Sequence, residues 1–448
     1  MPRIVHLGFG NFHRAHQAWY TAAANALGGP AWTITGVSMR RSDLRDALAS
    51  DGFAYTLGIR GTEGIEVQRI AVHDSVLVVP ENPQAVIDAI ADPETQIVSL
   101  TVTEKGYHLH PATGEPDLKG AALAADLVNP LPSTAIGILA RGLAQRAATN
   151  APITVLSCDN VSGNGRKLRR AVEGFAAAAG LDIGAYITAH VRFPDSMVDR
   201  ITPATTDAAR AEIAALTGRS EPQPVLTEAF SEWIVEDDFA GPRPDWGAVG
   251  VEIVPDVAPF EARKLRLLNA AHSCLAYAGQ LVGHRYVHEA IRDPHLRRVV
   301  EGLWDEAVST LPASVAATIP AYRAALLDRF EVEAMRHELA QIAQDGSLKL
   351  PLRLVPVLEQ RAARNEASPN VTQAVAAWLA FIRREVEAGR DLADPASTDL
   401  TAIVQEATDT PALCRAGVTF LDMKVPGPAW LAELVRAVDA FSRPSVTP

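Results

Sequence analysis

A change of pattern near residue 256 constrains the fold of this chain more than any other feature of its sequence. Before that point, short apolar runs rich in β-branched residues alternate with Ala- and Leu-rich stretches of helical period. Such alternation predicts βαβ units and a mostly parallel, doubly wound sheet. The expected strands lie at residues 4–9, 32–37, 97–103, 153–158 and 187–192, and two of the expected helices lie at 121–129 and 168–179.

From Glu261 to Phe441 the chain has helical periods and few strand candidates. Proline and turn residues gather just before this change, at 239–246 and 254–259. We therefore predict an α/β fold with two domains. Residues 1–255 are expected to carry the sheet, and residues 256–448 are expected to form a mainly helical domain.

Composition limits the partners and the compartment. The net charge of −12 argues against nucleic acid or an anionic membrane surface, because both need a basic face. No apolar stretch reaches the roughly 18 residues of a membrane span, and no signal peptide is expected, so we predict a cytoplasmic protein. Cys158, Cys274 and Cys414 are too few and too widely spaced for a disulfide framework or a thiolate zinc cluster.

The first expected strand runs into the segment GFGNFHRAH at residues 8–16. Two glycines after a strand and before a helix form a tight turn, and the backbone amides there can approach a pyrophosphate. A histidine stands where the usual fingerprint has its third glycine, so the turn alone does not distinguish cofactor binding from a structural role. The candidate cofactor contacts are Gly8, Gly10, Asn11, Phe12 and His13.

The end of the second expected strand leaves the cofactor's 2′ group undecided. An NAD site usually has Asp or Glu there to hold the ribose hydroxyls. Here the residues are Ser38-Met39-Arg40-Arg41, and no acid follows before Asp43. Arg40 suits the 2′-phosphate of NADP, or it is a solvated loop charge; NAD is the expected cofactor and NADP stays open.

The helix expected over residues 260–273 holds the strongest catalytic candidates. An α-helix turns by about 100° per residue, which places Glu261, His272 and Asn269 within about 140° of Lys264. Apolar residues lie on the opposite side, so we expect the helix to be buried. Polar groups that are buried need hydrogen-bond partners or a functional role.

Lys264 is one of only six lysines among 41 basic residues. A desolvated lysine can lower its pKa and release a proton, whereas arginine cannot, and a base near the working pH suits alcohol oxidation. The alternative is that Lys264 only pairs with Glu261 one turn earlier. Two other kinds of alcohol-oxidising site lack the residues they need. A short-chain dehydrogenase site needs Tyr-x-x-x-Lys, but no tyrosine has a lysine four positions later. A zinc alcohol dehydrogenase site needs cysteine ligands that these cysteines do not supply.

At this point the residues resemble the mannitol dehydrogenase family of long-chain, polyol-specific dehydrogenases and reductases. The resemblance covers nearly the whole chain. It implies a Rossmann-type N-terminal domain, a helical C-terminal domain similar to that of 6-phosphogluconate dehydrogenase, and a metal-free active site between them. The motifs are 8–16 (GFGNFHRAH), 99–107 (SLTVTEKGY), 157–160 (SCDN), 193–205 (FPDSMVDRITPAT), 230–239 (FSEWIVEDDF) and 264–272 (KLRLLNAAH).

The resemblance also implies roles for individual residues. Lys264 is the general base in oxidation and the acid in reduction. Asn160 and Asn269 hydrogen-bond the reacting oxygen and stabilise an alkoxide-like transition state. His272 holds the substrate through a hydrogen bond, and Glu261 connects the lysine to solvent.

Asp199, in the FPDSMVDR segment, matches a carboxylate of the site that orients its neighbours. The alternative for Asp199 is an ion pair with Arg200 or a turn cap.

Two segments favour sugar acids over polyols within this family. Residues 268–277 (LNAAHSCLAY) and 345–353 (DGSLKLPLR) are similar to the versions in fructuronate reductases. A uronate carries a carboxylate that mannitol lacks, and Lys349 with Arg353 supplies cations for it. The alternative is that these charges serve the fold after a Gly-Ser turn.

The predicted activity is therefore NAD-dependent, reversible reduction of D-fructuronate to D-mannonate by a monomer or weak dimer. Alternatives are a mannitol 2-dehydrogenase, an oxidoreductase for arabinitol or tagaturonate, and, in another class, a nucleotide-binding sensor without catalysis. The presence of Lys264, Asn160, Asn269 and His272 together argues against the sensor.

Overall fold

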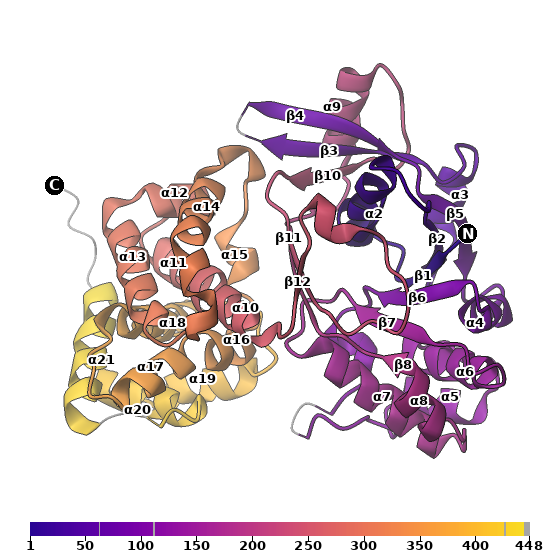
Figure 1. Cartoon of the computed structure of the whole chain (residues 1–448). Helices are drawn as coiled ribbons and strands as arrows, with labels where there is room; N and C mark the ends of the chain where they lie inside the picture. The colour runs from indigo at the N-terminus through magenta and orange to yellow at the C-terminus, as the bar shows by residue number, and fades with distance from the viewer. Residues whose placement is uncertain (62, 111–112, 425–426, 443–448) are drawn as a thin grey trace. The chain divides into compact units, whose positions relative to one another are not determined.

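The computed structural model describes residues 1–61, 63–110, 113–424 and 427–442. The chain forms two compact units, Met1–Ala258 and Pro259–Pro448, which are described separately below (Figure 1).

A six-stranded parallel sheet forms the centre of the first unit, with the strand order β5-β2-β1-β6-β7-β8. The order reverses between β1 and β6, which is the position where open α/β sheets bind ligands beyond the carboxyl ends of their strands. The predicted doubly wound parallel sheet is confirmed. Its strands are β1 (Arg3–Leu7), β2 (Thr33–Ser38), β5 (His73–Val78), β6 (Thr95–Leu100), β7 (Ile153–Ser157) and β8 (Val191–Arg192).

Alternate residues of each strand enter two separate cores. Val5 and Val98 face a core shared with helices α4, α6 and α7, whereas Ile4 and Ile97 face a core that includes α2. Burial on both faces explains why these strands are continuous apolar runs. The helices of this unit are α1 (Asn11–Ala15), α2 (Gln17–Ala26), α3 (Asp43–Ala49), α4 (Pro83–Ala91), α5 (Ala121–Val128), α6 (Ala135–Ala147), α7 (Asn164–Ala178), α8 (Gly184–His190) and α9 (Asp207–Thr217).

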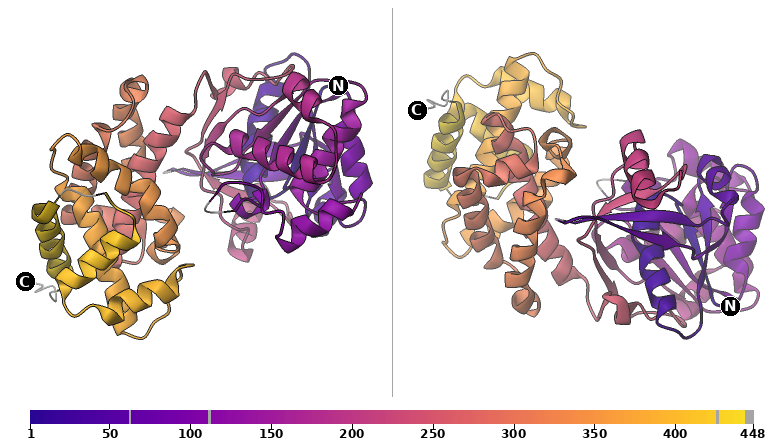
Figure 2. Two further views of the ribbon diagram at one scale, coloured as in Figure 1. Left: turned by 90° about the horizontal axis from the view of Figure 1, so that it is seen from below. Right: turned by 90° about the horizontal axis from the view of Figure 1, so that it is seen from above.

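Two small sheets in the same unit are not indicated by the sequence pattern. One has the order β10-β3-β4 and the other the order β12-β11-β9, each with one antiparallel pair. Figure 2 shows the long β3–β4 hairpin extending from the body of the unit. The strands are β3 (Tyr55–Gly61), β4 (Gly64–Ile70), β9 (Ser196–Asp199), β10 (Val225–Glu228), β11 (Glu232–Glu236) and β12 (Glu252–Val254).

The strand predicted at 187–192 is wrong over most of its length. Helix α8 runs to His190, and only Val191 and Arg192 join the sheet as β8. Tyr186 and Ile187, consecutive residues of this helix, are both buried. A short apolar run of this kind has no period that separates a strand from a buried helix.

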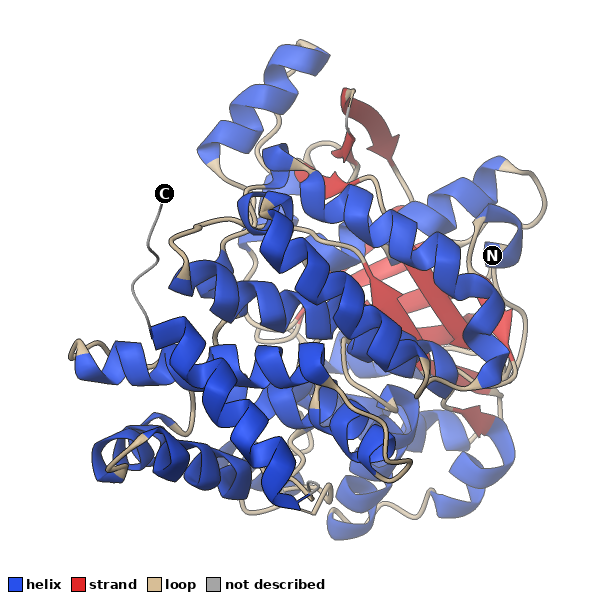
Figure 3. Ribbon diagram, turned by 90° about the vertical axis from the view of Figure 1, so that its left-hand side faces the viewer, coloured by secondary structure: helices blue, strands red, loops and turns tan. Residues whose placement is uncertain are grey.

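The second unit is helical, and its described residues contain no strand (Figure 3). Helix α18 (Pro369–Glu387) is buried along most of its length and packs against α11, α13 and α21. No helix in the described part of the chain is long and apolar enough to cross a membrane. The other helices are α10 (Ala258–Arg263), α11 (Ala270–Leu281), α12 (Val287–Arg292), α13 (Pro294–Val308), α14 (Ile319–Glu331), α15 (Leu339–Ile342), α16 (Gly346–Arg353), α17 (Val355–Ala362), α19 (Ser397–Glu406), α20 (Thr410–Phe420) and α21 (Gly427–Ser442).

Candidate active site

The turn between β1 and α1 is built tightly around Gly8. This glycine has φ +106°, and a Cβ added to it would lie 2.2 Å from the carbonyl oxygen of Thr101. The backbone N–H groups of Gly8 and Phe9 both donate to the carbonyl of Val37, at 2.9 and 3.0 Å. The turn is therefore fixed between β2 and β6, and a residue with a side chain does not fit at Gly8.

Gly10 has a different environment, although it belongs to the same turn. A Cβ added there would meet only the Gly8 carbonyl oxygen, at 3.7 Å. The protein itself thus leaves room at Gly10, which is at the N-cap of α1. Room beside a backbone at a helix N-terminus is what close approach of a phosphate requires.

His13 lies in the core, so its side chain is not the cofactor contact that the sequence predicted. It is fully buried, stacks on His6 with ring centroids 3.5 Å apart, and places Nε2 3.0 Å from Nε2 of His73. Burial lowers the pKa of His6 and His73 to about 3, so both rings are neutral near pH 7. A third glycine at this position would let the helix pack closely against the strands. Here the buried ring of His13 occupies the space between them.

This histidine cluster also supports the turn. His6 Nε2 lies 2.8 Å from Oγ1 of Thr101, and the Thr101 hydroxyl donates to the Gly8 carbonyl at 2.9 Å. Polar core groups therefore connect strand β6 to the turn after β1.

Asn11 and Phe12 follow the turn on α1. The Asn11 amide donates to the Pro203 carbonyl and to Thr205 Oγ1, each at 3.1 Å. Phe12 is half-buried and stacks on His16 with ring centroids 4.9 Å apart. These contacts of the two side chains are therefore within the protein.

The carboxyl end of β2 carries the two arginines considered for a 2′-phosphate. Arg41 is exposed and pairs with Asp43 at 3.4 Å, which is an ordinary surface ion pair. Arg40 is also exposed and lies two residues beyond Ser38, where β2 ends.

Asn160 is at the carboxyl end of β7, on the same edge of the sheet as the glycine turn. The strand residues before it are fully buried, Asp159 is buried, and Asn160 itself is exposed. Asp199 is buried at the end of β9. Arg200 donates to the carbonyls of Ala15 and Glu228 and stacks on the Trp19 ring, so these contacts do not use Asp199.

In the second unit, the predicted catalytic helix contains a π-helix from Lys264 to Asn269, which the sequence did not indicate. The α-helical angles predicted for this segment are therefore wrong. A π-helix bonds residue i to i+5, so Asn269 lies one turn above Lys264 on the same side. The deviation brings these two polar residues closer than an α-helix would.

A buried tryptophan supports this unusual turn. Trp304 on α13 is fully buried, and its Nε1–H donates to the carbonyl of Leu267 at 2.9 Å. The N–H of Ala270 reaches back to the carbonyl of Leu265. A side-chain donor inserted at a helix carbonyl is one of the causes that change helical winding.

The polar side of this helix is partly enclosed. Lys264 is buried, with 6% of its surface exposed, and Glu261, Asn269 and His272 are half-buried. The guanidinium of Arg353 donates to the Asn269 carbonyl at 3.3 Å and to Ser273 Oγ at 3.0 Å.

Burial and several basic side chains act on the pKa of His272. Burial is the largest cause that lowers its pKa well below 6.5, followed by the charges of His337, Arg329, Arg353 and Lys264. The ring of His337 lies 5.3 Å from that of His272. His272 is therefore a neutral hydrogen-bonding group in an environment that favours an anion.

The sequence did not indicate Arg329 or His337, because they lie on separate elements with no shared spacing. Burial lowers the pKa of Arg353 to about 10, which leaves its guanidinium charged at neutral pH.

Lys349, the other predicted substrate cation, is half-buried and contacts backbone carbonyls. Its ammonium donates to the carbonyls of Ile342 at 3.3 Å and Gln344 at 2.7 Å, at the C-terminal end of α15. A cation at a helix C-terminus satisfies unpaired carbonyls. Arg353 differs in that it donates hydrogen bonds to the catalytic helix.

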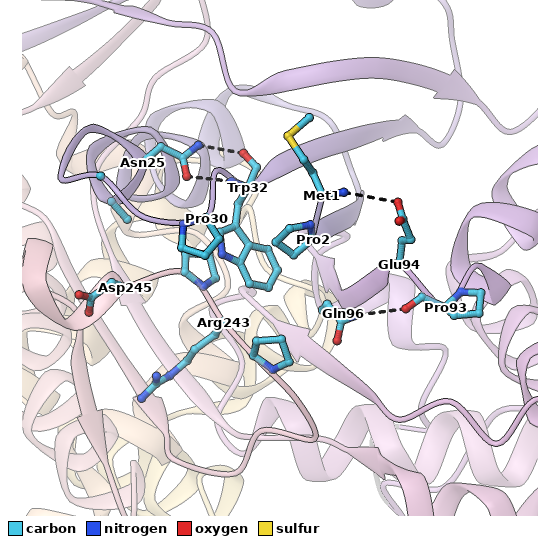
Figure 4. Close-up of a pocket in the computed structure, with 14 residues that line it drawn as sticks. Met1, Pro2, Asn25, Pro30, Trp32, Pro93, Glu94, Gln96, Arg243 and Asp245 are labelled. Carbon is cyan, nitrogen blue, oxygen red and sulfur yellow. Dashed lines mark hydrogen bonds and ion pairs between the residues drawn. The ribbon is translucent and has the colours of Figure 1, made fainter.

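A cavity of about 600 Å³ lies at the opposite edge of the parallel sheet (Figure 4). Pro2, Trp32 and Glu94, each just before a strand, line it together with Arg243. None of the predicted site residues lines it. In the part of the chain that the structure describes, no group of three or more His, Cys, Asp or Glu residues is placed to hold a metal ion.

Comparison with known families matches both units. The model described as "Mannitol dehydrogenase Rossmann domain" matches residues 2–248, and "Mannitol dehydrogenase C-terminal domain" matches residues 256–441. Together these matches span nearly the whole chain.

Individual relatives agree with this result. D-mannonate oxidoreductase of Escherichia coli K12 is 38% identical over 406 residues, which cover 88% of this chain and 83% of the relative. Mannitol 2-dehydrogenase of Phaeosphaeria nodorum is 36% identical over 452 residues, covering 98% and 79%. The structure of Pseudomonas fluorescens mannitol 2-dehydrogenase in ternary complex with NAD and D-mannitol has a TM-score of 0.82 at 34% identity, covering 98% of this chain and 92% of the other.

Proposed function

The chain belongs to the mannitol dehydrogenase family, and on that premise we propose that this oxidoreductase reduces D-fructuronate to D-mannonate with NADH, reversibly and without a metal. The observation that carries the choice of substrate is Arg353, whose guanidinium reaches Asn269 and Ser273 on the catalytic helix. A guanidinium holds a carboxylate through two hydrogen bonds, and a polyol offers no carboxylate to it. The E. coli relative named D-mannonate oxidoreductase supports the same choice.

The turn after β1 supports a dinucleotide cofactor. Gly8 closes the turn, Gly10 leaves room beside the N-terminus of α1, and both lie at the point where the strand order reverses. The solved mannitol 2-dehydrogenase with NAD supports NAD for this chain, and the exposed Arg40 keeps NADP as the alternative. When bound, the cofactor supplies the hydride for reduction and accepts it in oxidation.

Lys264 moves the proton in this proposal. In reduction, its Nζ gives a proton to the keto oxygen while the carbonyl carbon gains the hydride and the C=O π bond becomes an O–H bond. In oxidation, the neutral amine takes the proton from the hydroxyl. Burial of Lys264 favours the neutral form that this second step needs.

The neighbouring polar groups bind and orient the substrate. Asn269, one π-turn from Lys264, and Asn160 donate to the reacting oxygen and stabilise its developing negative charge. Neutral His272 hydrogen-bonds a substrate hydroxyl. Glu261 exchanges the proton with solvent, and Asp199 orients its neighbours.

The second candidate is a mannitol 2-dehydrogenase. Two relatives with this name support it, at 36% and 34% identity. The relatives therefore do not decide between a sugar acid and a polyol as the substrate. Arg353 favours the sugar acid.

Steady-state kinetics with fructuronate, tagaturonate, fructose and mannitol, each with both nicotinamide cofactors, test the proposal. We expect kcat/KM to be highest for fructuronate with NADH and to be unchanged after treatment with EDTA. Preference for mannitol or fructose would reject the sugar-acid assignment. Loss of activity with EDTA that zinc restores would reject the metal-free chemistry.

A further inference from the structure

The loop that follows β6 contains a residue in a conformation that only glycine adopts easily. Thr103 has φ +68° and ψ 164°, and its side chain is exposed. A β-branched residue is strained in this region, and such strain persists only where surrounding contacts impose it. An exposed side chain gains no packing that would compensate.

The contacts that impose this conformation come from Asp159. Its Oδ1 accepts a hydrogen bond from Thr103 N at 2.8 Å, and Oδ2 accepts from Val102 N at 3.2 Å and from the Tyr107 hydroxyl at 3.1 Å. Burial raises the pKa of Asp159, while these three donors oppose that rise. All three groups donate, which suits a carboxylate and not a neutral amide.

The other side of the loop is attached to the glycine turn. Thr101 N donates to the Leu7 carbonyl at 2.9 Å, and its hydroxyl donates to the Gly8 carbonyl at 2.9 Å. The loop and the turn therefore leave adjacent strands at the point where the strand order reverses. In doubly wound sheets of this order, the half beginning at β6 takes the second mononucleotide, which in NAD is the nicotinamide half.

We propose that Asp159 is a positioning residue, which holds the strained loop 101–103 in the place that the nicotinamide half of the cofactor requires. This inference rests on the proposed NAD-dependent function. Asp159 acts through the backbone of Val102 and Thr103 and also precedes Asn160 directly. The loop thus depends on one buried carboxylate rather than on a glycine.

Asp159→Asn tests the inference, with the dissociation constant of NADH measured by quenching of tryptophan fluorescence. The amide can accept from one backbone N–H but presents its NH2 group to the other, so Thr103 relaxes. We expect the Kd of NADH to rise about tenfold, as for loss of a hydrogen bond to a charged group. Tyr107→Phe removes one donor and leaves the carboxylate, so it serves if Asp159→Asn does not fold; a rise of about twofold is expected.

Thr103→Gly distinguishes positioning from general damage. Glycine adopts the positive φ without strain, so it should leave the Kd unchanged alone and restore most of the affinity in the Asp159→Asn background. Loss of affinity in Thr103→Gly alone would contradict the inference, because the side chain and not the loop position would then matter. Absence of rescue in the double variant would contradict it as well.

Asp126→Asn is the matched control. Asp126 is also a buried carboxylate that accepts from two successive backbone amides, Ser133 N at 2.9 Å and Thr134 N at 2.7 Å, in the loop between α5 and α6. It should lose stability like Asp159→Asn and keep the Kd of NADH. Equal weakening in both variants would overturn the inference. Failure of the unsubstituted protein to bind NADH would instead reject the proposed function and the inference with it.

Discussion

The two units bring their functional residues together in different ways. In the first unit, residues far apart in the chain gather because parallel strands end at one edge of the sheet, as Gly8, Thr101 and Asn160 do. In the second unit, Lys264 and Asn269 meet within one helix, and the winding of that helix determines their separation. A sheet edge follows from topology, whereas a π-turn depends on contacts from other helices. Four substitutions, three of them paired with a control substitution, test this difference.

Lys264→Ala should have the largest effect, and only on the chemical step. Positioned acid–base groups contribute about 10²- to 10⁴-fold, so kcat should fall by roughly three orders of magnitude. The Kd of NADH should stay within about twofold, because the cofactor contacts are predicted in the first unit. Lys264→Arg is the control: it keeps the charge, cannot release a proton, and should be equally inactive. A Lys264→Arg variant with substantial turnover would contradict the acid–base role.

Gly8→Ala should damage the first unit as a structure. The added Cβ would collide with the Thr101 carbonyl, and the positive φ is itself unfavourable. We expect the free energy of unfolding in urea to fall by about 3 kcal/mol.

Gly10→Ala is the matched control in the same turn. It has no such collision within the protein, so its unfolding free energy should change little while its Kd for NADH rises. Equal destabilisation by the two substitutions would show that Gly10 serves the fold only.

Arg353→Met should separate sugar acids from polyols. Loss of a hydrogen bond between charged groups costs about 1.5–3 kcal/mol, so kcat/KM for fructuronate should fall about 10- to 100-fold. Activity with fructose or mannitol should change much less.

Lys349→Met provides the comparison, because its ammonium contacts backbone carbonyls. It should lower stability and change all substrates alike. If Arg353→Met lowered kcat/KM for fructose and fructuronate by the same factor, Arg353 would not be the carboxylate contact.

Trp304→Phe should have the smallest effect and tests the winding of the catalytic helix. It keeps a buried ring and removes the donor to the Leu267 carbonyl. We expect a loss of about 1 kcal/mol in unfolding free energy, with a modest fall in kcat as the turn between Lys264 and Asn269 relaxes. A variant that lost stability with an unchanged kcat would separate Trp304 from the alignment of the site.

The sequence predicts those parts of the structure that depend on local pattern. Strands β1, β2, β6 and β7 were expected because burial on both faces makes them continuous apolar runs. Strand β3 is buried only over its first four residues, its partner β4 is mostly exposed, and the α8–β8 segment is short, so none of them gives a comparable signal. Contacts between distant residues are also invisible in the sequence, which is why the core position of His13 was not expected and why the sequence left both alternatives for Lys349 open.

The candidate site likewise has parts that local sequence pattern predicts and parts that depend on contacts between distant residues. Motifs identified Lys264, Asn269, His272 and Arg353 individually. The environment of His272, with Arg329 and His337 beside it, depends on how α14 and the following segment pack against α11. Asp159 was not singled out, because its role depends on the dihedral angles of Thr103.

Chemical rescue of Lys264→Ala is the most direct test of the central claim that this buried lysine moves the proton. Turnover of D-mannonate with NAD would be measured in the variant at increasing concentrations of ethylamine. We predict that the rate rises with the concentration of the free amine and reaches a measurable fraction of the original turnover. The claim would be contradicted if ethylamine left the turnover of the variant unchanged although small molecules were shown to reach the site. It would also be contradicted if the variant kept near-normal turnover without any amine.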